Sequence, residues 1–182
     1  MRRMGVLPRK ILTSMEFESW RYCRATANSA SAPVTDGSAP AGLRVVVTST
    51  ASDSHTWNLI YLQLLLEELG NHVINFGPCV PDQVLVDRCR ALRPDLIVMS
   101  SVNGHGVQDG IGAISLIRSA PELTSTPVVI GGKLGVAGPD GGESARRLAA
   151  AGFDAVFHDG DDIAVFRAFV DALPAPRREL RR

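Results

Sequence analysis

One short segment of the chain carries the residue types that could hold a metal through a single imidazole. Asp53, Ser54 and His55 are consecutive, and Thr56 and Asn58 follow closely. A carboxylate two residues from an imidazole can accept one ring N–H, which fixes the tautomer and leaves the other nitrogen as a basic lone pair for a metal. In the alternative reading, Asp53 or Ser54 caps a helix and His55 is a solvated residue of its first turn.

The number of available ligands limits which metal this segment could bind. Zinc needs three or four protein ligands, and no other histidine or cysteine lies close to His55 in the sequence. A corrin ring already supplies the equatorial nitrogens of cobalt, so one histidine is sufficient there. The segment therefore suits a metal that brings most of its own ligands.

Two further segments combine hydroxyl groups and glycines. Residues 100–106 read SSVNGHG, and a glycine pair occurs at residues 131–132. Glycines let a large flat ligand or a nucleotide approach the backbone, although turns and helix caps use the same residues. His105, between two glycines, is expected in a loop. The candidate ligand contacts from these segments are Ser100, Val102, Gly104, Gly131 and Gly132.

Apolar runs and helical patterns alternate from residue 43 onward. Strands are expected at 43–47, 73–76, 96–99, 127–130 and 155–157. The first intervening helix is expected to turn its regularly spaced apolar residues inward, namely Trp57, Ile60, Tyr61, Leu64, Leu65 and Leu69. For the later helices the inward residues are expected to be Val84, Leu85, Cys89 and Leu92; Ile111, Ile114 and Ile117; Ala145, Leu148 and Ala149; and Ile163, Phe166, Phe169, Val170 and Leu173.

This alternation predicts an α/β fold with a doubly wound, five-stranded parallel sheet of the flavodoxin-like (Rossmann-like) type, in the order 2-1-3-4-5. In such sheets ligands bind outside the carboxyl ends of the strands, near the switch in strand order. The loops after the first, third and fourth strands should then form one rim.

Composition bounds the remaining possibilities. Of 182 residues, 19 are basic and 19 acidic, so no basic field favours nucleic acid. No apolar run reaches the roughly 18–20 residues of a membrane span, and three cysteines without C-x-x-C spacing favour reduced thiols in a cytoplasm. Residues 1–42 are interpreted as an N-terminal extension and disordered linker, 43–173 as the folded domain and 174–182 as a solvated basic tail.

The three motifs, Asp53-x-His55, Ser100-x-Val102 and Gly131-Gly132, resemble those of the base-off/His-on cobalamin-binding domains, which carry Asp-x-His-x-x-Gly, Ser-x-Leu and Gly-Gly at these strand ends. Within that family the chain is similar to the small (sigma) subunits of glutamate mutase, also called methylaspartate mutase. The similarity extends over roughly residues 43–173 and includes EELG at 67–70 and VINFG at 73–77.

The resemblance implies that His55 is the axial ligand of cobalt and that Asp53 holds its other nitrogen. Ser100 and Val102 would line the slot for the displaced nucleotide tail, and the glycine pair would let that tail pass the backbone. The cofactor contacts implied are Asp53, Ser54, His55, Thr56, Asn58, Ser100, Val102, Gly104, Gly131 and Gly132.

The same resemblance implies an isomerase subunit that is inactive alone. It would present adenosylcobalamin to a separate, barrel-shaped large (epsilon-type) catalytic subunit, which holds the amino-acid substrate, for rearrangement of glutamate to 3-methylaspartate. No catalytic residue is assigned to this chain. Two departures, Asn58 for glycine and Val102 for leucine, put the fit of the tail and the identity of the partner in question. Trp57 could cover the cofactor or pack in the core.

Three alternatives remain open from the sequence. A corrinoid carrier for methyl transfer would share the histidine ligand, but such carriers have a preceding helical bundle, for which residues 1–42 are short and polar. An FMN electron carrier would use the hydroxyl-rich residues 48–52 to hold a phosphate. A phospho-signalling receiver would need an aspartate at the end of the third strand, where Ser100 stands.

Overall fold

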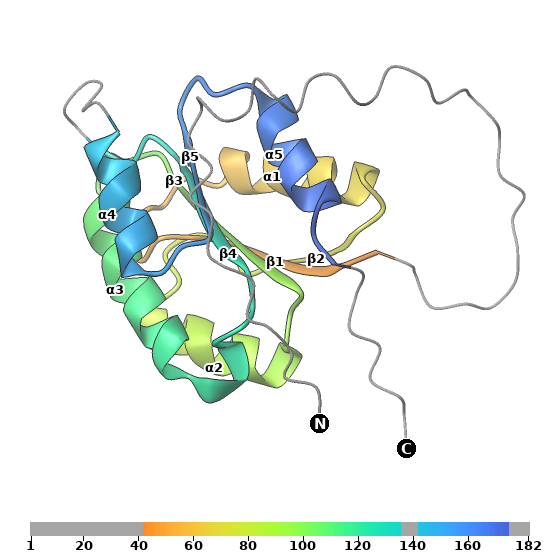
Figure 1. The fold of residues 1–182 in the computed structure, drawn as a ribbon, viewed down its shortest axis with the longest axis horizontal. Helices are drawn as coiled ribbons and strands as arrows, with labels where there is room; N and C mark the ends of the chain where they lie inside the picture. Colours follow the sequence, from red (N-terminus) through yellow and green to blue (C-terminus); the bar gives the residue numbers. More distant parts are fainter. Residues whose placement is uncertain (1–41, 136–141, 175–182) are drawn as a thin grey trace, which may run out of the picture. The chain divides into compact units, whose positions relative to one another are not determined.

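A computed structural model describes residues 42–135 and 142–174, and it contains one five-stranded sheet between helices (Figure 1). The strands are β1 (Arg44–Ser49), β2 (His72–Asn75), β3 (Leu96–Ser101), β4 (Val128–Gly132) and β5 (Ala155–His158). All neighbouring pairs are parallel, and the order is β2-β1-β3-β4-β5. The predicted fold class and strand order are confirmed. The N-terminal extension up to residue 41 and most of the basic tail, residues 175–182, lie outside the described residues.

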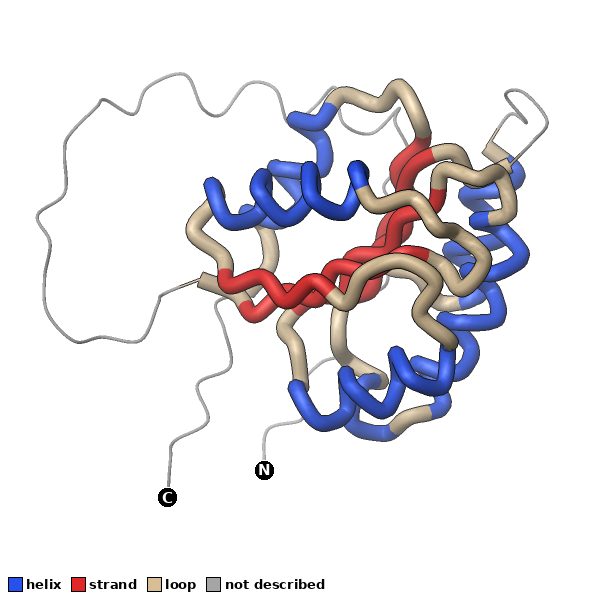
Figure 2. Tube along the Cα trace, turned by 180° about the vertical axis from the view of Figure 1, so that it is seen from behind, coloured by secondary structure: helices blue, strands red, loops and turns tan. Residues whose placement is uncertain are grey.

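Helices cover both faces of the sheet (Figures 1 and 2). α1 (Trp57–Glu68) and α5 (Ile163–Asp171) lie on one face, and α2 (Asp82–Leu92), α3 (Gly106–Ser119) and α4 (Glu143–Ala151) on the other. A short 3-10 helix, Pro121–Leu123, precedes β4. Because successive side chains of a strand point to opposite faces, β1 contributes Val45 and Val47 to one core cluster and Val46 to the other. The continuous apolar runs of the sequence therefore mark strands that are buried on both sides.

The orientation of α1 differs from the prediction. The residues expected to face inward at the start of the helix are exposed: Trp57 to 63%, Ile60 to 54%, Tyr61 to 51% and Leu64 to 61%. Leu65 is buried and Leu69 packs against the core, as predicted, while Leu59 and Leu66 are buried without having been predicted. The helix is apolar on nearly every side, so spacings of three and four residues fit more than one face and do not identify the buried one. Two other residues expected inside, Val84 and Ile163, are 44% and 38% exposed.

This orientation predicts opposite results for two neighbouring leucines. Leu66→Ala removes a fully buried side chain, so we expect the free energy of unfolding to fall by about 2–5 kcal/mol. Leu64→Ala changes an exposed position, and we expect a change within about 0.5 kcal/mol. Urea unfolding followed by circular dichroism measures both. Equal losses in the two variants would contradict the orientation of α1.

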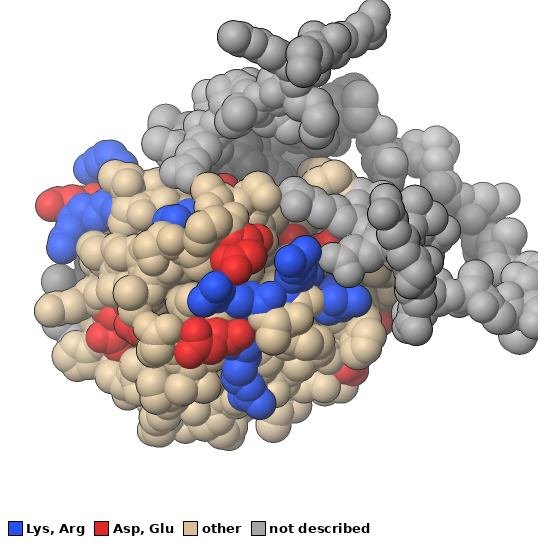
Figure 3. All heavy atoms as spheres, turned by 90° about the horizontal axis from the view of Figure 1, so that it is seen from below, with Lys and Arg blue, Asp and Glu red and all other residues tan. Residues whose placement is uncertain are grey.

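The described surface and cysteines can be compared with the expectations from composition. Basic and acidic side chains are interspersed on the face seen in Figure 3. Over the described ranges, no helix is long and apolar enough to cross a membrane. Cys79 and Cys89 are both free thiols, and burial raises the pKa of the Cys89 thiol to about 12.

Candidate functional site

The register of the sheet brings the three predicted loops to one edge. Ser49 at the end of β1 lies beside Ser100 of β3, and Ser100 lies beside Gly131 of β4. Because β1 and β3 are neighbours while their connections run to opposite faces, the loops that follow them diverge and leave room for a ligand. The expected rim is therefore present.

Asp53 connects the loop after β1 to the end of β3. Its carboxylate is fully buried, and Oδ1 accepts the backbone N–H of His55 at 3.0 Å. Oδ2 accepts the backbone N–H of Val102 at 2.5 Å. The backbone carbonyl of Asp53 also accepts hydrogen bonds, from the Ser49 hydroxyl at 2.7 Å and from the Cys79 N–H at 3.0 Å. These four hydrogen bonds fix the position of Asp53 and of its carboxylate.

The imidazole of His55 lies against that carboxylate. The distance from Nδ1 to Asp53 Oδ1 is 2.7 Å, while the His55 side chain is 48% exposed. A carboxylate at this distance favours the tautomer with the proton on Nδ1, which leaves Nε2 as the lone-pair nitrogen on the exposed side. Neither Asp53 nor Ser54 caps α1, because the N-cap is Thr56 and it makes no side-chain capping bond. The capping alternative is therefore wrong for both residues.

Asp53 is kept in its charged form. Burial alone would raise the pKa of its carboxyl, but the N–H groups of His55 and Val102, together with the His55 ring, outweigh burial and lower that pKa below 3.8. The carboxylate that orients the imidazole is thus ionised throughout the neutral range.

Replacing Asp53 by asparagine should show how much the ionised carboxylate contributes to stability and how that contribution depends on pH. An amide has only one oxygen and cannot accept the N–H groups of both His55 and Val102, so we expect the free energy of unfolding at pH 7 to fall by about 1.5–3 kcal/mol. Because the folded-state pKa is depressed, the stabilisation is complete above about pH 4 and is lost as the pH falls through that lowered value. Wild type and variant should therefore converge in urea unfolding at low pH. The matched control is Asp159→Asn, which alters an exposed carboxylate on the same rim and should change little at either pH.

The loop after β3 is tied to both of its neighbours. Asn103 donates from Nδ2 to the backbone oxygen of Ser52 at 3.0 Å, and Gly104 donates its N–H to Lys133 at 3.2 Å. Gly104 has φ +84°, a backbone conformation that glycine adopts without strain. His105 is exposed and precedes α3 as its N-cap residue. These hydrogen bonds attach the loop after β3 to the loops after β1 and β4.

The glycine pair at the end of β4 has no room for side chains. A Cβ atom at Gly131 would lie 3.2 Å from Phe157, and one at Gly132 would collide with the carbonyl oxygen of Ser101. Gly132 also has φ +106°. The packing of β4 thus favours glycine at both positions, and the pair lines the cavity with backbone alone.

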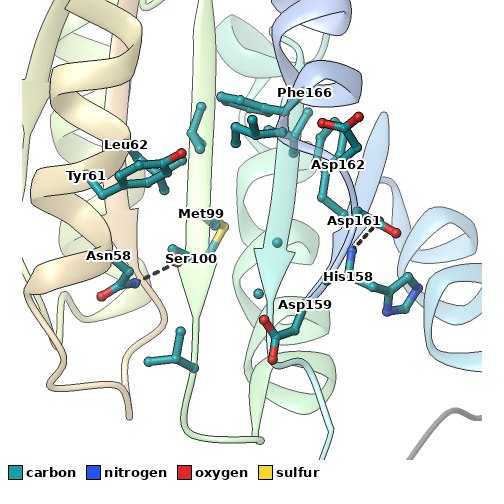
Figure 4. A pocket seen from close by; sticks show the side chains of 18 of the residues that line it. Asn58, Tyr61, Leu62, Met99, Ser100, His158, Asp159, Asp161, Asp162 and Phe166 are labelled. Atoms are coloured by element: carbon teal, nitrogen blue, oxygen red, sulfur yellow. Dashed lines mark hydrogen bonds between the residues drawn. The ribbon is translucent and has the colours of Figure 1, made fainter.

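A cavity of about 310 Å³ opens between α1, α5 and the carboxyl ends of β3, β4 and β5 (Figure 4). Five of the predicted contacts line it, namely Asn58, Ser100, Val102, Gly131 and Gly132. Asp53 and His55 do not line it; they stand beside it, joined to it through the Val102 N–H. Ser54, Thr56 and Gly104 are also outside the lining, and the first two are exposed.

The remaining walls were not predicted from the sequence. The floor is apolar, with Val98, Val129, Phe157 and Phe166, and the two phenyl rings meet edge to face with centroids 5.3 Å apart. The mouth includes the loop after β5, His158–Asp162, and the exposed rings of Trp57 and Tyr61. Trp57 is therefore not a core residue. The sequence did contain a signal for the β5 loop: the predicted fifth strand must end at the same edge of the sheet, so the loop after it could have been expected at the site.

Asn58 is part of helix α1 and does not have a left-handed backbone. The absence of glycine at this position therefore causes no strain in the turn. The side chain is 5% exposed, donates from Nδ2 to Ser100 Oγ at 2.6 Å, and leaves its own Oδ1 buried without a partner. A polar group thus stands in the wall of an apolar cavity.

The hydroxyl-rich stretch after β1 does not face a ligand. Thr48, Ser49 and Thr50 are fully or almost fully buried. The hydroxyls of Thr48 and Ser49 donate to backbone carbonyl oxygens of the same loop. These groups stabilise the loop that carries Asp53. Of the hydroxyl groups at residues 48–52, only that of Ser52 is exposed and accessible to the phosphate of the flavin alternative.

Comparison with known proteins identifies a matching family and several relatives. Residues 43–166 match the B12 binding domain family. The chain is 30% identical over 129 residues to the glutamate mutase sigma subunit of Halobacterium salinarum, covering 71% of this chain and 83% of the relative. It is also 30% identical over 118 residues to glutamate mutase sigma subunit 2 of Haloarcula marismortui, with 65% and 78% covered.

Solved structures support the fold. A cobalamin-binding protein from Desulfitobacterium hafniense superposes with a TM-score of 0.57 at 18% identity, over 71% of this chain and 59% of that one. The chemotaxis response regulator CheY4 of Vibrio cholerae gives 0.56 at 14% identity, over 73% and 99%. At these identities the likeness shows the shared fold alone, and the function must be argued from the site.

Proposed function

Because the chain belongs to the B12 binding domain family, we propose that it is the adenosylcobalamin-carrying small subunit of a carbon-skeleton mutase of the glutamate mutase type. The observation that carries this proposal is the buried Asp53 carboxylate that holds the half-exposed imidazole of His55 beside an apolar cavity. The glutamate mutase sigma subunits among its relatives support the reaction class.

The residues at the rim fit cobalamin on three grounds. His55 offers one nitrogen, Nε2, and the described ranges contain no group of three or more histidine, cysteine or acidic residues that could hold a bare ion. Such a single ligand suits a cobalt that is already held by a corrin. The cavity floor is apolar and aromatic, which suits a flat heteroaromatic base. The bare backbone at Gly131 and Gly132 would admit the linking part of the tail.

In this arrangement the protein positions its cofactor and leaves the substrate to a partner. His55 Nε2 would hold the cobalt, and Asp53 would keep the ring in one tautomer and one orientation. Ser100 and Val102 would retain the displaced tail at the cavity mouth. When bound, adenosylcobalamin supplies the organic radical that starts a hydrogen abstraction and a carbon-skeleton rearrangement. A separate large subunit would bind the amino acid and cover the rim.

Reconstitution tests this function. We expect the purified chain, mixed with a glutamate mutase large subunit and adenosylcobalamin, to convert carbon-13-labelled glutamate into 3-methylaspartate, as followed by nuclear magnetic resonance. Omission of either protein, or replacement of adenosylcobalamin by methylcobalamin, should abolish the product. Methyl transfer from methylcobalamin by the chain, without any rearrangement, would instead indicate a corrinoid carrier.

A further inference from the structure

The outer face of α1 carries a continuous row of exposed apolar side chains. This row, called the α1 stripe below, consists of Trp57, Ile60, Tyr61 and Leu64, which are between 51% and 63% exposed. Spacings of three and four residues place the four side chains next to each other on one side of the helix. Single exposed apolar residues are common on proteins, but a contiguous row marks a place where another surface binds.

A ligand in the cavity does not account for the α1 stripe. Trp57 and Tyr61 line the cavity, whereas Ile60 and Leu64 do not, so the stripe continues along the helix beyond the cavity mouth. Its two aromatic and two aliphatic side chains leave roughly 400 Å² of apolar surface in water, the size of the largest patch on a typical monomer. A row of about two helical turns fits the side of another helix.

The charges at the two ends of α1 indicate which helix would fit. Glu67 and Glu68 are exposed and follow the stripe at its C-terminal end, while the first turn of α1 has no acidic residue and no side-chain cap. Carboxylates are unfavourable near a helix C-terminus and stabilising near an N-terminus. Glu68 is paired with Arg167 at 3.0 Å, whereas Glu67 accepts a hydrogen bond from the neutral Gln63 at 2.9 Å. The carboxylate of Glu67 is therefore suited to the N-terminus of a different helix.

We propose that the α1 stripe is a self-association surface, on which α1 of a second copy of this chain packs in the antiparallel direction. A twofold axis between Ile60 and Tyr61 places Trp57 of each copy against Leu64 of the other. Glu67 of each copy then lies at the N-terminus of the other α1, which has no acidic residue of its own. The same carboxylates would repel an anionic membrane surface. The inference goes beyond the proposed function and needs no cofactor.

The size of the α1 stripe sets the strength of this association. Two stripes bury roughly 800 Å², and the residues around them raise the total to about 1,000–1,200 Å², the lower end of specific interfaces. We therefore expect a weak dimer, with a dissociation constant on the order of 10–100 µM. Unfolding measured well below that concentration is then the unfolding of the monomer.

Sedimentation velocity of the full chain tests the surface, in a concentration series that spans the expected dissociation constant and without cobalamin. Leu64→Glu puts a charge into the apolar seam, outside the cavity lining, and should weaken the dimer by at least about tenfold. Ile60→Gln replaces it if circular dichroism shows that the glutamate variant does not fold. The matched control is Val84→Glu, at a 44% exposed apolar position on α2, which should leave the dimer unchanged.

Glu67→Gln tests the direction of packing. In the antiparallel dimer the two carboxylates stabilise two helix N-termini, so their removal should weaken the dimer by about three- to tenfold. In a parallel dimer the two Glu67 side chains would lie side by side and repel each other, so the same variant would tighten the dimer. A tighter dimer in Glu67→Gln would therefore overturn the antiparallel arrangement.

Three further results would overturn self-association through the α1 stripe. The first is a chain that stays monomeric over the whole series. The second is a dimer that Leu64→Glu and Ile60→Gln both leave intact, because the interface then lies elsewhere. The third is a monomeric chain whose affinity for a glutamate mutase large subunit falls in Leu64→Glu, which would assign the stripe to that subunit. Cobalamin binding is measured separately, so failure of the proposed function would be recognised by itself.

Discussion

Replacing His55 by alanine is expected to remove the protein nitrogen from cobalt and to weaken cobalamin binding by at least the roughly 10–100-fold that loss of a supporting residue costs in metal sites. The reason is geometric: the Asp53 carboxylate lies 2.7 Å from Nδ1, so Nε2 is the nitrogen left to coordinate. Electron paramagnetic resonance of the Co(II) form reads this directly. In protein labelled with nitrogen-15 histidine, the superhyperfine pattern should change from that of the unlabelled protein, and in His55→Ala the label should make no difference.

A second histidine on the same rim provides the matched control. His105 is also exposed, but it precedes α3, and among the described residues no carboxylate contacts its ring. His105→Ala should retain both the affinity and the labelled spectrum of the wild-type chain. If the signal is lost in His105→Ala and retained in His55→Ala, the ligand lies in the loop after β3, and the site described above is wrong.

Gly132→Ala is expected to damage both stability and binding. The residue has φ +106°, and a Cβ atom there would collide with the carbonyl oxygen of Ser101. Strained backbone of this kind costs on the order of 1–3 kcal/mol before any steric clash is added. We therefore expect the free energy of unfolding to fall by at least about 2 kcal/mol. The affinity for cobalamin should fall as well, because β4 must move away from β3 at the cavity mouth.

Gly135 offers the comparison for this prediction. It lies three residues further along, and a Cβ atom there would meet nothing within 4 Å. Gly135→Ala should leave unfolding and binding close to wild type. If the two alanine variants behave alike in urea unfolding and in absorbance titration, the positive φ of Gly132 and the contact with the Ser101 carbonyl oxygen do not require glycine there.

The fold and the three motif loops could be predicted because each depends on local sequence. A strand buried on both faces is a continuous apolar run, and parallel strands align their carboxyl ends whatever the details of packing. The buried face of α1 could not be predicted, because a helix that is apolar on nearly all sides has no preferred face until the sheet is in place. Trp57, Ile60, Tyr61 and Leu64 were consequently assigned to the core and are exposed.

The cavity could not be predicted from the sequence either. Its floor combines Val98, Val129, Phe157 and Phe166, which are far apart in the sequence and individually ordinary core residues. The register of β3, β4 and β5 brings the first three together, and the packing of α5 adds Phe166. Asn58 could be identified in the sequence as a departure from a glycine motif, but its hydrogen bond to Ser100 depends on the distance between a helix and a strand, which the sequence does not specify.

The carboxylate of Asp53 is shared between the imidazole of His55 and the backbone N–H of Val102, which lines the cavity. The proposed ligand of cobalt, His55, and the proposed seat of the displaced base are therefore linked through one carboxylate. By reciprocity, whatever free energy an occupied cavity adds to cobalt ligation, ligation must return to the cavity. The affinity that a corrinoid truncated at its tail loses beyond that of the contacts it lacks measures this coupling.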